Sequence, residues 1–186
     1  MNSNVSGQVN AFPAWRTLRP SNRPLSITNF ERVRLMHGIA ISDQTKFVDG
    51  KSFSFLSPED KGEVELVAIS PSELGYALAL RKAKPPKKSV SQYRYQFTLR
   101  EFFYLAEKNG LSLCTGDICP QISLLCASLS KLEIFAIAMN PVLNSQGDPC
   151  LLCIEHNEHG RVLRTYIGQL DKIKHDTTRF IFVRRK

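Results

Sequence analysis

Two apolar segments near the end of the sequence, residues 150–156 and 161–167, most tightly constrain what this chain can fold into. Only four residues, Asn157-Glu158-His159-Gly160, separate them, and their composition is typical of a turn. Apolar segments of this length on either side of a short turn have the pattern of an antiparallel β-hairpin. The sequence therefore predicts two paired strands here, and the fold must include a sheet that contains them.

Further strands are predicted along the chain. Residues 33–39 alternate between inward and outward positions, which indicates a strand with one buried face. Asp49-Gly50 lies between two short apolar segments and favours the tight turn of a second hairpin. Residues 133–139 are almost wholly apolar, so we expect them at the centre of the sheet. The remaining strand candidates are residues 63–69, 93–97 and 179–184.

Three segments have the apolar spacing of amphipathic helices. The clearest begins at a capping box formed by Thr98 and Glu101 and ends at Gly110, a residue suited to the turn that follows a helix. A second capping box precedes residues 74–81, and residues 122–129 repeat the helical spacing after a proline. The sequence thus predicts a group of helices in the middle of the chain.

Strands at both ends with helices between them predict the α+β fold class. We expect a single domain, residues 30–186, in which a mixed or mainly antiparallel sheet packs against about three helices. Residues 1–29 contain three prolines and show no periodicity, and are expected to form an extended arm on that domain. Phe12, Trp15 and Leu18 are the expected anchors of this arm.

Composition and targeting signals indicate the compartment. No apolar run approaches the length of a membrane span, and the first ten residues lack the basic and apolar regions of a secretory signal. The five cysteines are an odd number and are expected to be reduced thiols. We therefore expect a cytoplasmic protein without a membrane partner.

Charge is the main indication of function. The net charge is +8, and seven cations occur between residues 81 and 100 without an intervening acid. Tyr93 and Tyr95 have the spacing of one strand face, where rings can stack on bases beside cations that bind phosphate. The alternative interpretation is a solvated loop. The candidate nucleic-acid-binding residues are Arg81, Lys82, Lys84, Lys87, Lys88, Tyr93, Arg94, Tyr95, Arg100, Arg184 and Arg185.

A second hypothesis is a metal-dependent nuclease. Such enzymes use converging acids to hold a divalent metal that activates water and stabilises the leaving oxygen. Asp148, Glu155 and His156 are close in the sequence and are the candidate catalytic residues. The alternative interpretation is that all three are turn or surface residues.

The cysteines suggest a weaker alternative, a zinc site formed by Cys114, Cys119, Cys150 and Cys153. Cys150 and Cys153 are three apart on a predicted strand, so their side chains point to opposite faces. Thiols packed in the core are therefore the favoured interpretation, and we expect no metal and no other cofactor unless the protein is a nuclease.

The leading hypothesis is a basic accessory or regulatory protein that contacts nucleic acid mainly through phosphates and is not an enzyme. The metal-dependent nuclease is the first alternative. The second alternative is an inhibitor or regulator that binds another protein, of the kind encoded by plasmids and phages. The sequence indicates neither the oligomeric state nor whether the nucleic acid partner is DNA or RNA.

Overall fold

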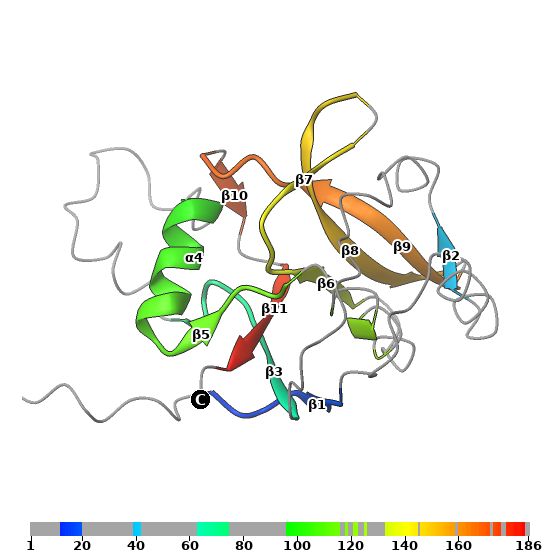
Figure 1. The fold of residues 1–186 in the computed structure, drawn as a ribbon. Helices are drawn as coiled ribbons and strands as arrows, with labels where there is room; N and C mark the ends of the chain where they lie inside the picture. The colour runs from blue at the N-terminus through cyan, green and yellow to red at the C-terminus, as the bar shows by residue number, and fades with distance from the viewer. Residues whose placement is uncertain are drawn as a thin grey trace, which may run out of the picture.

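The computed structural model describes residues 12–19, 39–41, 63–74, 96–115, 118, 121–122, 125, 133–144, 146–158, 160–171, 173–175 and 178–184. These residues form a sheet of nine strands, a second sheet of two strands and a ten-residue helix (Figure 1). The elements, in chain order, are β1 (Arg16–Leu18), β2 (Ile39–Ile41), β3 (Val64–Ile69), β4 (Gln96–Thr98), α4 (Leu99–Lys108), β5 (Leu111–Ser112), β6 (Ile134–Ile137), β7 (Val142–Leu143), β8 (Pro149–Asn157), β9 (Gly160–Ile167), β10 (Ile173–His175) and β11 (Arg179–Arg184).

The main sheet has the strand order β1-β3-β11-β6-β8-β9-β2, and β5 and β7 pair with β11 and β8 beside this path. Its pairs are mostly antiparallel, but β11 runs parallel to β6, and β2 runs parallel to β9. One edge of β11 pairs with β3. Its other edge pairs with β6 along residues 179–181 and with β5 along residues 183–184. The C-terminal strand therefore lies in the interior of the sheet.

The predicted hairpin is confirmed. β8 and β9 pair in one continuous antiparallel register, from Cys150 opposite Ile167 to Asn157 opposite Gly160. Gly160 has a φ of +105°, a conformation that a residue with a side chain rarely adopts. Strands are also confirmed at residues 64–69, 134–137 and 179–184, and β6 lies between β11 and β8 as expected for a central strand.

The predicted fold class, an α+β domain whose sheet packs against about three helices, is wrong. Within the described part of the chain, most of the elements are strands, and α4 is the one helix whose first and last residues are both described. Ser70 and Glu73 do form capping-box bonds, in which the Ser70 N–H donates to Glu73 Oε2 at 2.7 Å. Residues 71–74 nevertheless form a turn, because these bonds close one turn of backbone whether or not a helix continues.

Other sequence predictions lie wholly or partly outside the described residues. These are residues 75–81 of the second helix, the Asp49-Gly50 hairpin, and residues 33–38 of the alternating strand. Of that strand, the structure describes Ile39, the first residue of β2. Of the third helix, residues 121, 122 and 125 are helical and the others lie outside the described part.

Aromatic side chains hold α4 against one face of the sheet. The ring centroids of Phe102 and Phe180 are 5.0 Å apart, and those of Phe103 and Phe182 are 5.9 Å apart. On the other face Trp15, which precedes β1, stacks on Phe135 of β6 at 5.1 Å. The segment expected to be an extended arm thus contributes a strand to the sheet and a ring to its core.

The ends of α4 are fixed by the bonds that the sequence predicts. The Thr98 hydroxyl accepts from the Glu101 N–H at 3.2 Å, and the Glu101 carboxylate accepts from the Thr98 N–H at 3.0 Å. After the helix, Gly110 has a φ of +79°, and the chain turns directly into β5. This tight turn places β5 beside the helix, next to β11 (Figure 1).

Candidate functional site

Most of the predicted nucleic-acid-binding residues lie outside the described part of the chain. Arg100 and Arg184 are the two that the structure describes. The others are Arg81, Lys82, Lys84, Lys87, Lys88, Tyr93, Arg94, Tyr95 and Arg185.

Arg184, near the end of β11, makes structural contacts. Its Nε donates to Glu65 Oε2 at 2.7 Å, and its Nη2 donates to the carbonyl oxygen of Phe12. Its side chain is only 14% exposed. Arg184 therefore joins β3 and the segment before β1 to the C-terminal strand, and its guanidinium is largely occupied by these partners.

Arg100, in the first turn of α4, is also paired. Its Nε and Nη2 donate to the two carboxylate oxygens of Asp171 at 2.7 and 3.0 Å. The hydrogen bond to Asp171 raises the pKa of Arg100, and the same bond lowers the pKa of Asp171. The Arg100 N–H also donates to the Leu170 carbonyl at 3.0 Å, so the helix start is tied to the segment before β10.

Ion pairing extends to other arginines of the sheet. Arg19 pairs with Glu63, Arg164 with Glu155, and Arg179 with Glu73. The whole chain has a net charge of +8, and residues 81–94 contribute six cations and no acid to it.

The three candidate nuclease residues do not converge on one point. Asp148 lies in the turn before β8, where its N–H donates to Asn144 Oδ1 at 2.9 Å. Glu155 is seven residues further along the strand, which corresponds to roughly 23 Å of extended chain. Glu155 and His156 are consecutive on β8, so their side chains point to opposite faces of the sheet.

The described cysteines lie in the core. Cys114, Cys150 and Cys153 are buried thiols that are not joined in a disulfide, and Cys119 lies outside the described residues. Cys114 Sγ donates to the Ile181 carbonyl at 3.3 Å, and burial raises the pKa of Cys153 to about 11. Within the described ranges, no three His, Cys, Asp or Glu side chains are grouped so that they could hold a metal ion.

A cavity beside α4, here called the α4 cavity, was not predicted from the sequence. Its volume is about 430 Å³, within the usual range for small-molecule sites. Phe103, Leu111 and Phe182 are buried and form its inner wall, and Leu113 and Leu170 are partly buried at its sides. The inner surface is therefore apolar and includes two aromatic rings.

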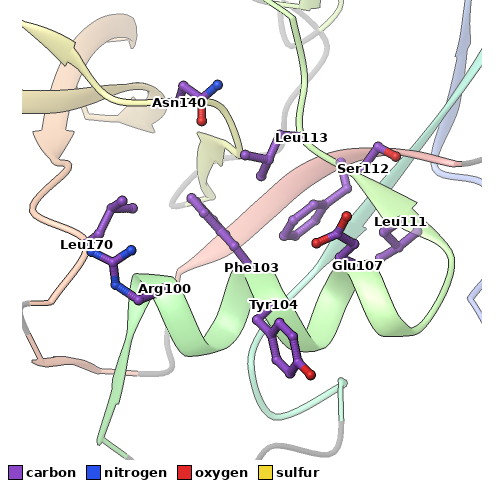
Figure 2. Close-up of a pocket in the computed structure, with 10 residues that line it drawn as sticks. Arg100, Phe103, Tyr104, Glu107, Leu111, Ser112, Leu113, Asn140 and Leu170 are labelled. Carbon is purple, nitrogen blue, oxygen red and sulfur yellow. The ribbon is translucent and has the colours of Figure 1, made fainter.

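Polar groups lie around the mouth of the α4 cavity. They are Arg100 and Glu107 of α4, Ser112 of β5 and Asn140 of the loop after β6. Figure 2 shows Arg100 and Glu107 at separate ends of the cavity, with Phe103 between them. The site thus combines an apolar interior with a guanidinium, a carboxylate, a hydroxyl and an amide at its rim.

The outer side of α4 carries an exposed ring between two cations. Tyr104 is 60% exposed, and the ammonium of Lys108 lies 5.3 Å from its ring centroid. Arg100, Tyr104 and Lys108 follow one another at intervals of four residues, so they form one stripe on the helix. Tyr104 marks the border between this stripe and the α4 cavity.

A second cavity, of about 740 Å³, shares Arg100 and Leu170 with the first. Its wall includes Gly168, whose backbone lies against Cys150 so closely that an added Cβ would be 2.8 Å from the Cys150 Cα. Arg100 therefore lies between two hollows on the same side of the molecule.

The α4 cavity could not be found from the sequence because its lining comes from separate parts of the chain. Only the interval of three or four residues between Arg100, Phe103 and Glu107 is local, and a packed helix has the same interval.

Within the described residues, no helix is both long and apolar enough to cross a membrane. No protein-family model, curated protein or solved structure matches this chain.

Proposed function

We propose that this protein is a basic accessory or regulatory protein that binds nucleic acid, mainly through the phosphates, using the cations at residues 81–94. The observation that carries this proposal is the separation of charge within the chain. Residues 81–94 contain six cations and no acid, whereas the rest of the chain has 19 Lys and Arg against 17 Asp and Glu, a net charge of +2. A run of cations that contains no acid in its sequence concentrates positive charge, and concentrated positive charge attracts a polyanion.

The structure limits the part that Arg100 and Arg184 play in this proposal. Arg184 is held by Glu65 and the Phe12 carbonyl, so we assign it to the stability of the sheet. Arg100 is exposed, although its Nε and Nη2 are paired with Asp171. Since it lies six residues after Arg94, the last cation of the basic stretch (residues 81–94), it can extend the phosphate-binding surface onto α4.

Binding through phosphates determines the properties of the complex. Each phosphate contact releases condensed counterions, so affinity falls steeply as salt rises, and base sequence has little effect. We place this activity in the cytosol, and the free thiols of Cys114, Cys150 and Cys153 fit a reducing compartment. No divalent metal is required for binding.

The test compares two charge reversals by fluorescence anisotropy with labelled single-stranded and duplex oligonucleotides in EDTA. In the variant with Lys87→Glu and Lys88→Glu, we expect affinity to fall about tenfold for every sequence tested. The matched control is Lys46→Glu with Lys51→Glu, which changes the net charge equally outside the basic stretch.

The control variant is expected to retain most of the affinity. Equal losses in the two variants would mean that net charge alone drives binding and that residues 81–94 form no site. Wild-type affinity in the Lys87→Glu, Lys88→Glu variant would remove these lysines from the interface.

A further inference from the structure

The α4 cavity has the kind of wall on which a nucleobase stacks. Phe103 and Phe182 contribute rings whose centroids lie 5.9 Å apart at an interplanar angle of 89°. Both rings are buried, so they form the floor of the cavity, and the ring whose face an entering planar group can reach is Tyr104, which is 60% exposed at the cavity border. Stacking on aromatic side chains is the main sequence-tolerant contact between proteins and single-stranded nucleic acid.

The rim of the cavity supplies groups that match the polar edge of a base. Asn140 has an amide that both donates and accepts, Ser112 has a hydroxyl, and Glu107 has a carboxylate with several acceptor sites. Base edges present amino donors and carbonyl or ring-nitrogen acceptors. Figure 2 shows Asn140 and Ser112 on different sides of the space into which Phe103 and Leu113 project.

The position of the cavity relates it to the basic stretch. β4 begins at Gln96, two residues after Arg94, and leads directly into α4. Arg100, in the first turn of α4, lines the cavity. Only five residues of sequence separate Arg94, the last cation of residues 81–94, from Arg100 of the cavity.

We infer that the α4 cavity receives one unpaired base of a single-stranded nucleic acid, which gives the protein a preference for single strands over duplex. This inference rests on the proposed function and adds to it the class of nucleic acid. A base in a duplex is stacked and paired, so it reaches such a cavity only at the cost of leaving the helix. In a single strand, the base is already accessible.

The first experiment measures anisotropy with a labelled 12-nucleotide single strand and with the same sequence as a blunt duplex. In Leu170→Trp, the indole fills the cavity, and we expect single-strand affinity to fall about tenfold while duplex affinity stays unchanged. Asn140→Ala removes a group from the exposed rim without touching the core, and we expect a loss of about threefold for the single strand alone.

The matched control is Leu143→Trp, which adds the same ring on β7. Leu143 is 58% exposed and does not line the cavity. Both affinities of this variant are expected to equal those of the wild type. Thermal melts of all variants confirm that each is folded, and Asn140→Ala keeps the test open if Leu170→Trp does not fold.

A second experiment does not depend on the basic stretch. Nucleoside 5′-monophosphates are titrated into the wild-type protein, and methyl resonances of Leu113, Leu170 and Leu143 are followed by NMR. We expect concentration-dependent shifts for Leu113 and Leu170, which line the cavity, and none for the control Leu143.

The outcomes separate this inference from the proposed function. Oligonucleotide binding whose single-strand and duplex affinities are unchanged in both cavity variants overturns the inference and leaves the proposed function standing. Monophosphate shifts without any oligonucleotide binding at low salt overturn the proposed function and leave a base-binding cavity. The absence of both signals overturns both.

Discussion

The arginines of the sheet and the cations at residues 81–94 differ in their acidic neighbours. Five described arginines form ion pairs, four with glutamates and one with an aspartate from other segments of the chain. Among residues 81–94 there are six cations and no acid. The proposed function therefore assigns different roles to the same residue types, which the net charge of +8 alone does not distinguish.

From this difference we expect that one set of variants alters the stability of the protein and another set alters its affinity for nucleic acid. Changes in the core or in the paired arginines should alter the free energy of unfolding and leave the intrinsic affinity for nucleic acid unchanged. The proposed function predicts the reverse for the cations of residues 81–94, namely weaker binding with little change in the free energy of unfolding. The predictions below test this separation, from the largest expected effect to the smallest.

Phe102→Ala should destabilise the protein most. Phe102 is fully buried and contacts Phe180 and Phe182, so removing its ring leaves a cavity between α4 and the sheet. We expect a loss of about 3–5 kcal/mol in the free energy of unfolding, measured by urea denaturation. The folded fraction should bind oligonucleotides as the wild type does. A loss below about 1 kcal/mol would contradict the described packing.

Gly168→Ala should have the next largest effect. The added Cβ would lie 2.8 Å from the Cys150 backbone, which is part of the β8 strand and has little room to move. We expect a destabilisation of about 2 kcal/mol by urea denaturation. The control is Gly147→Ala, where no atom lies within 4 Å of the new Cβ, although the φ of +81° adds local strain. A neutral Gly168→Ala variant would mean that this close approach is absent.

Arg184→Gln tests the comparison directly. The change removes the ion pair with Glu65 from a side chain that is only 14% exposed, and we expect a loss of about 1–2 kcal/mol of stability. We expect oligonucleotide affinity to remain within about twofold of the wild type. Lys87→Gln is the opposite case, with unchanged stability and weaker binding. Reversed results for these two variants would break the distinction between Arg184 and the cations of residues 81–94.

The thiol of Cys153 should affect stability only at high pH, so its effect near neutral pH is the smallest. Burial raises its pKa to about 11, whereas the unfolded thiol has a pKa near 8.5. Between these values the unfolded chain releases a proton that the folded chain keeps, so stability falls as pH rises through this range. The stability of Cys153→Ala should depend less on pH there. Equal pH dependence in the two proteins would show that the thiol is not buried.

Local signals identified several elements of the fold. The capping box at Thr98 and the glycine at position 110 bound α4, and the apolar segments around the Asn157–Gly160 turn form the β8–β9 hairpin. After Ser70 the capping box forms one turn over residues 71–74, and residues 75–81, which were predicted to continue it as a helix, lie outside the described part. The parallel pairing of β6 with β11 joins segments about 45 residues apart and has no local signal.

The candidate site was less predictable than the fold. The basic stretch is contiguous, so its charge can be read directly from the sequence. Whether an arginine is paired depends on a partner far along the chain, as with Arg184 and Glu65, which are 119 positions apart. The α4 cavity likewise depends on how separate segments meet. Sequence alone therefore located the excess charge and could not show which cations were already neutralised.

The salt dependence of binding tests the central claim most directly. The slope of log affinity against log salt concentration is measured for the wild type and for a variant in which the six cations of residues 81–94 are replaced by Gln. The separation of charge predicts that this variant loses most of the slope, a decrease of about four to five if every replaced cation contacts a phosphate, while its melting temperature stays unchanged. An unchanged slope would contradict the account and would place the phosphate contacts elsewhere in the chain.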